Sequence, residues 1–170
     1  MELAGKKVLV VGLGKTGEAV ANFLVSRGAQ VLVSEIKTVE ELGSKARFWR
    51  EMGAVLETGT HNIRSFLDAD LIIPSPGAAA LPEIAVAKRA GITVISEIEL
   101  AFSYLKGRIV GISGTNGKST TATLAHKILR EAGLKAYLAG NIGTPLISLV
   151  DKSRADHIYV TEISSFQLEH

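Results

Sequence analysis

Short apolar segments rich in valine and isoleucine alternate along this chain with segments whose apolar residues recur every three or four positions. The first pattern predicts buried β-strands and the second predicts amphipathic helices. Strands joined by helices form parallel sheets covered on both faces, so the sequence predicts an α/β fold. We expect strands at residues 7–12, 30–34, 54–58, 70–74, 92–95, 108–113, 136–139 and 157–163, and helices at 16–27, 39–52, 82–90, 98–105 and 118–132.

Residues at and near the helix ends refine this picture. Glycine follows four of the predicted helices, where a left-handed residue commonly ends a helix: Gly28, Gly53, Gly91 and Gly133. In the predicted helix 39–52, Phe48, Trp49 and Met52 lie at helical spacing, which predicts that they belong to the core.

A strand, a glycine-rich loop and a long helix open the chain, and the same succession restarts near residues 105–107. We therefore predict a Rossmann-like domain over residues 1–105 and the start of a second α/β domain, of the P-loop type, over residues 106–170. The second part has only 65 residues, which is small for a domain, so we expect it to be a piece of one. The closing Leu-Glu-His, 168–170, is either natural or the start of a purification tag.

Composition excludes several classes of protein. The 170 residues are 46% hydrophobic and 21% charged, as in soluble globular proteins, and the net charge of +2 gives no sign of a nucleic-acid partner. The absence of cysteine excludes disulfides, thiol nucleophiles and cysteine-ligated metals, and His61, His126 and His157 show no metal-ligand spacing. The apolar run 8–14 is too short to span a membrane, so we expect a cytoplasmic protein without a membrane partner.

The strongest chemical signal is Gly-Thr-Asn-Gly-Lys-Ser-Thr at residues 114–120, between a predicted strand and a predicted helix. Glycines let backbone N–H groups converge on phosphate oxygens, and the helix N-terminus adds positive potential. Lys118 can reach the β- and γ-phosphates, and the Ser119 hydroxyl can ligate Mg²⁺. The alternative is a strand-to-helix turn without a ligand.

A second glycine loop, Gly-Leu-Gly-Lys-Thr-Gly at residues 12–17, also lies between a strand and a helix. Its spacing matches the dinucleotide fingerprint, in which an acidic residue such as Glu35 accepts a ribose hydroxyl. Tight packing of helix on strand, with no ligand, would require the same glycines.

Three further features are compatible with function but do not require it. Ser75-Pro76-Gly77 follows a strand at the end where open sheets bind ligands, and is equally a simple turn. Residues 140–145 form a loop of turn-forming residues. Glu162 interrupts an apolar strand, so it is either a carboxylate ligand for Mg²⁺ or a residue that faces outward.

Taken together, these segments resemble the Mur ligases of bacterial cell-wall synthesis. The resemblance covers the whole chain and is carried by residues 12–17, 75–77, 114–120, by Gly-Asn-Ile-Gly at 140–143 and by Glu-Ile-Ser-Ser-Phe-Gln-Leu-Glu at 162–169. The last of these resembles the members that add D-glutamate. Two positions differ from the family pattern: Glu35 stands where Asp is frequent, and Lys37 stands where Arg is common, so a bidentate pyrophosphate contact would be lost.

The resemblance also implies which residues bind which ligand. The UDP-linked substrate would contact Gly14, Lys15, Thr16, Glu35, Lys37, Ser75 and Gly77 from the first domain, and Asn141, Ser164 and Gln167 from the second. The ATP phosphates would contact Gly114, Thr115, Asn116, Gly117, Lys118, Ser119 and Thr120. Mg²⁺ would be held by Ser119 and Glu162, and the catalytic residues would be Lys118 and Glu162.

The reaction implied is ATP- and Mg²⁺-dependent formation of an amide between UDP-N-acetylmuramoyl-L-alanine and D-glutamate, through an acyl phosphate, by a monomeric protein of three domains. By the same resemblance this chain would lack the third domain and be inactive alone. Two alternatives remain open: an NAD-dependent dehydrogenase built on the first glycine loop, and a non-catalytic nucleotide-binding module.

Overall fold

The computed structural model of this chain describes residues 1–164 and Gln167. It forms two compact units, Met1–Glu97 and Ile98–His170, which we describe separately as unit 1 and unit 2. The boundary predicted at residues 105–106 comes after helix α6 (Glu97–Phe102), whereas the division between the units comes at the start of this helix. The terminal segment 168–170 lies outside the described residues.

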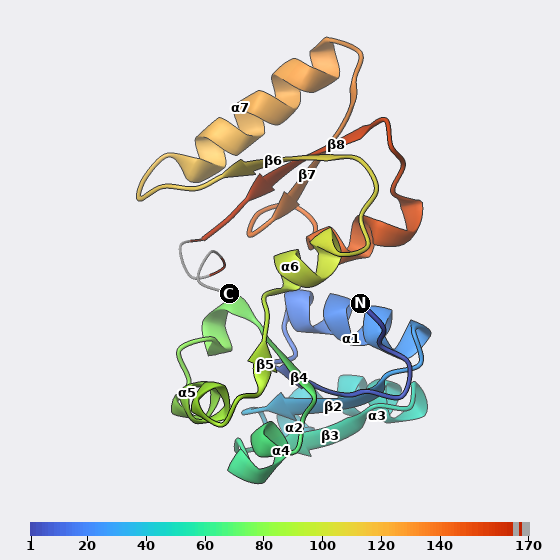
Figure 1. Cartoon of the computed structure of the whole chain (residues 1–170), viewed down its shortest axis with the longest axis vertical. Coiled ribbons are helices and arrows are strands. Elements are labelled where there is room, and N and C mark those ends of the chain that lie inside the picture. Colours follow the sequence, from blue (N-terminus) through green and yellow to red (C-terminus); the bar gives the residue numbers. More distant parts are fainter. Residues whose placement is uncertain (165–166, 168–170) are drawn as a thin grey trace. The chain divides into compact units, whose positions relative to one another are not determined.

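Unit 1 contains a five-stranded parallel sheet in the order β3-β2-β1-β4-β5 (Figure 1). Its strands are β1 (Lys7–Val11), β2 (Gln30–Glu35), β3 (Val55–Thr58), β4 (Leu71–Pro74) and β5 (Thr93–Val94). This order, with helical connections, is that of a dinucleotide-binding half of the Rossmann fold, which confirms the predicted α/β class.

Helices lie on both faces of this sheet. They are α1 (Lys15–Ser26), α2 (Val39–Leu42), α3 (Ser44–Glu51), α4 (Ile63–Leu67), the 3₁₀ segment η1 (Pro76–Ala78) and α5 (Pro82–Arg89). On one face, Gly17 of α1 approaches Val10. On the other, Phe66 of α4 and Ile84 of α5 join the cluster around Leu9. No helix in the described part of the chain has the length and apolar character of a membrane span.

The predicted helix 39–52 is two helices, so that prediction was wrong in extent. Gly43, with a φ of 55°, separates α2 from α3. Trp49 is buried as predicted, but Phe48 and Met52 are 50% and 36% exposed, because the short α3 presents only a narrow stripe to the sheet. The short segments α4 and η1 were not predicted, because five or fewer residues are too few for a helical period. The glycines predicted to end helices all have positive φ: Gly28, Gly53, Gly91 and Gly133.

Unit 2 contains a three-stranded parallel sheet in the order β6-β8-β7. Its elements are β6 (Arg108–Ile112), α7 (Lys118–Glu131), β7 (Lys135–Gly140), the 3₁₀ segment η2 (Leu146–Lys152) and β8 (His157–Glu162). The central strand β8 is buried along its whole length, and α7 packs on the sheet (Figure 1). The strand, glycine loop and helix predicted for a second α/β domain are therefore present.

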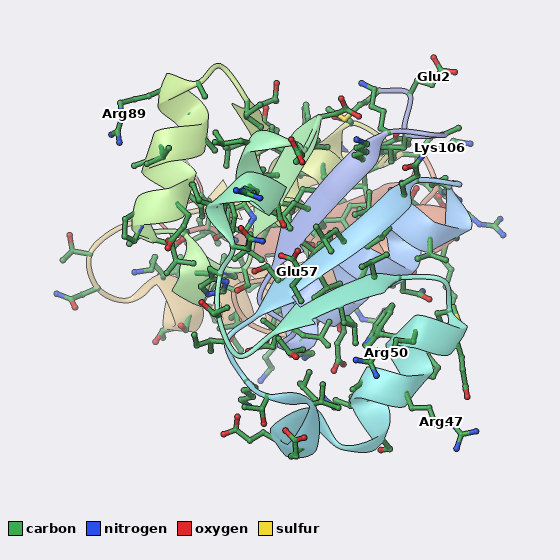
Figure 2. The ribbon with its side chains drawn as sticks, turned by 90° about the horizontal axis from the view of Figure 1, so that it is seen from below. Glu2, Arg47, Arg50, Glu57, Arg89 and Lys106 are labelled. Atoms are coloured by element: carbon green, nitrogen blue, oxygen red, sulfur yellow. The ribbon has the colours of Figure 1, made fainter. Side chains whose placement is uncertain are left out.

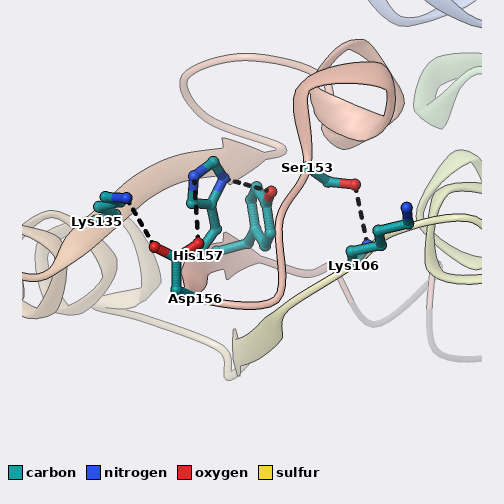
Figure 3. Close-up of polar contacts among 6 residues, drawn as sticks. Lys106, Lys135, Ser153, Asp156 and His157 are labelled. Atoms are coloured by element: carbon teal, nitrogen blue, oxygen red, sulfur yellow. Dashed lines mark hydrogen bonds and ion pairs between the residues drawn. The ribbon is translucent and has the colours of Figure 1, made fainter.

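A cluster of aromatic and charged side chains lies at the amino ends of β7 and β8 (Figure 3). Tyr137 stacks on Tyr159, with ring centroids 5.6 Å apart, and His157 Nδ1 lies 3.2 Å from the Tyr159 hydroxyl. Lys135 Nζ donates to Asp156 at 2.7 Å. Burial, followed by the neighbouring Tyr137, raises the pKa of Tyr159 above its ordinary value, whereas the hydrogen bond from Lys135 lowers that of Asp156.

Candidate nucleotide-binding sites

The glycine–lysine loop of unit 2 connects the carboxyl end of β6 to the first turn of α7. Gly114 and Gly117 have φ values of 140° and 76°, which residues with a Cβ rarely adopt, and Gly117 is the N-cap of α7. The first N–H groups of a helix have no partner within it, so they are available to an anion. The loop therefore has the local geometry of a phosphate cradle.

Lys118 folds back over this loop. Its Nζ donates to the carbonyl oxygen of Gly114 at 2.6 Å and to that of Thr115 at 3.4 Å. Phosphate oxygens could replace these two carbonyl oxygens as acceptors for the Lys118 ammonium.

Glu162 lies beside the cradle, at the end of β8, and is only 2% exposed. The Ser119 hydroxyl donates to its Oε2 at 2.6 Å, and the Asn141 side-chain amide donates to its Oε1 at 3.0 Å. The alternative in which Glu162 faces outward is therefore wrong. The carboxyl ends of β6, β7 and β8 bring together residues from three separate motifs of the sequence.

The Gly-Asn-Ile-Gly loop holds Asn141 in this position. The Asn141 N–H donates to the Glu162 carbonyl at 3.0 Å, so both its main chain and its side chain bind Glu162. A Cβ at Gly140 would collide with that same carbonyl, and a Cβ at Gly143 would lie 2.7 Å from the Leu138 oxygen. The glycines thus permit the close approach, which composition alone did not indicate.

Ser164 and Gln167 bond to one another. Gln167 Oε1 accepts the Ser164 N–H at 2.9 Å and the Ser164 hydroxyl at 3.1 Å. Their contact with a UDP-linked substrate stays a prediction, and residues 165–166 of the same motif lie outside the described part of the chain.

A hollow of about 440 Å³ follows the exposed side of α7 beyond the cradle. It is lined by Ser119, Thr120, Thr123, Leu124 and Lys127. Among the described residues, no three His, Asp or Glu side chains gather to hold a metal ion. Mg²⁺ needs fewer protein ligands, because it keeps water and binds phosphate oxygens, and the paired oxygens of Ser119 and Glu162 fit that donor set.

The first glycine loop, in unit 1, joins β1 to α1. Gly12 has a φ of 88°, and its N–H donates to the Ser34 carbonyl at 2.8 Å. A Cβ at Gly17 would collide with the Gly12 carbonyl oxygen, and a Cβ at Gly12 would collide with the Ser75 hydroxyl. Close packing therefore accounts for both glycines, and Ser75 packs against the loop.

Glu35 binds the backbone of this loop rather than facing solvent, with 7% of the residue exposed. Its Oε2 accepts the Leu13 N–H at 2.5 Å, and its Oε1 accepts the Lys37 N–H at 3.0 Å. The Gly59 N–H donates to the carbonyl oxygens of Glu35 and Lys37. Glu35 is thus the centre of a network that holds three loops at the carboxyl end of β2.

The other unit 1 residues predicted to bind the UDP-linked substrate lie at the same edge of the sheet. Gly14, Lys15, Lys37 and Gly77 are exposed, whereas Thr16 and Ser75 are half-buried. The Ser75 N–H donates to the Val11 carbonyl at 2.8 Å, which joins the 75–77 turn to the end of β1. Their roles toward a UDP-linked substrate stay predictions.

His61, which shows no metal-ligand spacing, makes a contact that the sequence did not reveal. Its Nδ1 lies 2.7 Å from the hydroxyl of Ser34, which is fully buried one residue before Glu35. His61 therefore ties the loop after β3 to the same network. Metal-ligand spacing could not have revealed it, because the contact depends on the pairing of β2 with β3.

Comparison with known proteins gives a consistent result for both units. The family model described as "Mur ligase MurD-like, N-terminal domain" matches residues 6–96, and "Mur ligase middle domain" matches residues 112–170. The UDP-N-acetylmuramoylalanine–D-glutamate ligase of Acidobacterium capsulatum is 49% identical over 99% of this chain, and that of Geotalea daltonii is 47% identical over the same share. The chain spans 37% and 38% of the lengths of these two relatives.

Solved structures show the same similarity. A pseudomurein peptide ligase type C from Methanothermus fervidus superposes with a TM-score of 0.53 at 28% identity, covering 95% of this chain and 33% of that one. A ligase from Neisseria meningitides that acts on UDP-N-acetylmuramate has a TM-score of 0.51 at 20% identity, over 94% of this chain and 52% of that one, and so supports the fold alone.

Proposed function

Because this chain belongs to the Mur ligase family, we propose that it carries the nucleotide-binding parts of an ATP-dependent enzyme that joins D-glutamate to UDP-N-acetylmuramoyl-L-alanine. One observation carries the proposal: a buried carboxylate, Glu162, is bonded to the serine of the glycine–lysine loop at 2.6 Å. A nucleotide phosphate site with its own oxygen ligands is what phosphoryl transfer needs. A dehydrogenase would leave unit 2 without a role.

In this reaction the terminal carboxylate of the UDP-linked substrate attacks the γ-phosphorus of ATP, and ADP leaves. The amine of D-glutamate then attacks the carbonyl carbon of the acyl phosphate, and the nitrogen loses a proton and phosphate leaves as the amide forms. Lys118 and the N–H groups of residues 114–119 would hold the phosphates and offset their charge. Mg²⁺, when bound by Ser119 and Glu162, would supply electrostatic stabilisation of the transferred phosphoryl group.

Unit 1 would bind the UDP part of the substrate. Glu35 supports this as a positioning residue, because it shapes the glycine loop through the Leu13 and Lys37 N–H groups. Asn141 would act in the same way on Glu162. Since ATP and nucleotide-linked sugars are cytoplasmic compounds, we place the reaction in the cytoplasm. The absence of turnover by these 170 residues alone stays a prediction, which a phosphate-release assay checks.

Separate titrations test the proposal. We expect UDP to shift the amide signals of Gly14, Thr16 and Gly77, and ATP with Mg²⁺ to shift those of residues 114–119. Lys118→Ala should weaken ATP binding by about ten- to a hundredfold through loss of a charge-assisted hydrogen bond, and leave UDP binding unchanged. Lys152→Ala, an exposed position of unit 2 that does not line the hollow beside the cradle, is the control. Tighter binding of NAD than of UDP, or equal weakening of both ligands by Lys118→Ala, would contradict the proposal.

A further inference from the structure

One face of the unit 1 sheet is only partly covered by helices. The α4 and α5 helices lie on this face, and α4 has just five residues. Register places Leu9, Leu32 and Val55 in one row across β1, β2 and β3. Leu9 is fully buried, but Val55 at the sheet edge is 62% exposed, so the helices cover only part of this row.

A groove of about 570 Å³ occupies the uncovered part. This volume lies within the range of small-molecule sites, about 300–1,000 Å³. Leu9, Leu32 and Val55 are among the residues that line it, and so are the polar residues Glu57, Ser65 and Asp68. The glycine loop and Glu35 lie instead at the carboxyl ends of β1 and β2, so this groove is separate from the first glycine loop.

Glu57 gives the groove a specific chemical feature. Figure 2 shows it among the β-strands of this face, and its Oε1 accepts the Ser65 hydroxyl at 2.6 Å. Its Oε2 is buried and has no hydrogen-bond partner among the described residues. A buried carboxylate oxygen without a donor costs free energy, which a ligand that brings a donor can recover.

We propose that this groove is a second ligand site, which takes a small molecule with an apolar body and one ammonium group. Leu32 and Val55, the less buried part of the apolar row, would contact the body, and the Glu57 carboxylate would accept the ammonium N–H. The charges that line the groove favour a cation, since two carboxylates, Glu57 and Asp68, stand against a single ammonium, that of Lys7. A neutral donor would satisfy the oxygen but not the charge.

The test is an NMR titration of the isotope-labelled 170-residue chain with cyclohexylmethylammonium, and with cyclohexylmethanol as its neutral counterpart. We expect the ammonium to shift the amides of Leu32, Val55 and Ala69 saturably, and to bind about tenfold or more tightly than the alcohol. Saturating UDP should not displace it. Absence of saturable shifts up to about 10 mM, equal affinity for both compounds, or shifts confined to the glycine loop would overturn the proposal.

Variants separate Glu57 from a general charge effect. Glu57→Gln should lower the affinity for the ammonium to that for the alcohol. Glu83→Gln is the matched control, because Glu83 also has a buried oxygen with no hydrogen-bond partner in the described part of the chain but does not line the groove. If Glu57→Gln does not fold, Ser65→Ala decides: it keeps the charge and removes a competing donor, so the ammonium should bind at least as tightly. Weaker binding to Ser65→Ala would overturn the proposal.

Discussion

Shortening Glu35 to Asp tests whether its carboxylate holds the first glycine loop. In the native chain the carboxylate spans two backbone donors, Leu13 N–H at 2.5 Å and Lys37 N–H at 3.0 Å. Aspartate is shorter by one C–C bond, about 1.5 Å, and cannot reach both. The buried, charge-assisted bond that is lost corresponds to about 1.5–3 kcal/mol of unfolding free energy. With a urea slope of about 1–3 kcal/mol/M, the unfolding midpoint should fall by about 1 M.

The assay is urea unfolding followed by tryptophan fluorescence. The chain has one tryptophan, Trp49, which is 3% exposed and lies in unit 1, so the signal reports this unit. Glu51→Asp is the control. The exposed Glu51 forms an ion pair with Arg47 one helical turn away, so this substitution should change the free energy of unfolding by less than about 0.5 kcal/mol. If Glu35→Asp and Glu51→Asp unfold at the same urea concentration, the carboxylate does not hold the loop.

Three further results are expected. In thermal or urea unfolding, Gly17→Ala should cost about 3 kcal/mol or more, because its Cβ meets a backbone carbonyl that cannot rotate away, whereas Gly14→Ala, which has open space, should cost at most about 1 kcal/mol. Asn141→Ala should weaken binding of ATP with Mg²⁺ by about tenfold, measured by calorimetry, since it leaves Glu162 without one of its donors. Because the raised pKa of Tyr159 favours the neutral phenol in the folded state, stability should be retained below pH 10 and fall as pH rises above it, and Tyr159→Phe should flatten this fall in alkaline unfolding curves.

The strands and both glycine loops could be predicted because their signals are local. A run of apolar residues, then glycines, then a helical period specifies strand, loop and helix without knowledge of the rest of the fold. Short helices gave no such signal, and the break at Gly43 was hidden inside a longer apparent period.

Contacts between strands could not be predicted in the same way. Glu162 was a candidate ligand from its sequence, but its bond to Asn141 depends on the register that pairs Gly140 with Glu162. Glu35 was predicted as a ligand acceptor, whereas both of its oxygens accept backbone N–H groups, because glutamate is long enough to reach across to Leu13. Such contacts depend on the strand order and on whether a side chain is long enough to reach its partner. Neither can be seen in the sequence of one protein.

The strand order of unit 2 also determines when its sheet can form during synthesis. In unit 1 each strand after β1 pairs with a strand that has already been made. Among the described strands of unit 2, β6 and β7 both pair with β8, and Arg108 pairs with Ile158, 50 residues later. At about 5–20 residues per second, the ribosome takes about 2.5–10 s to make that stretch. During these seconds β6 and α7 have been synthesised but β8 has not, so the nascent segment is accessible to chaperones.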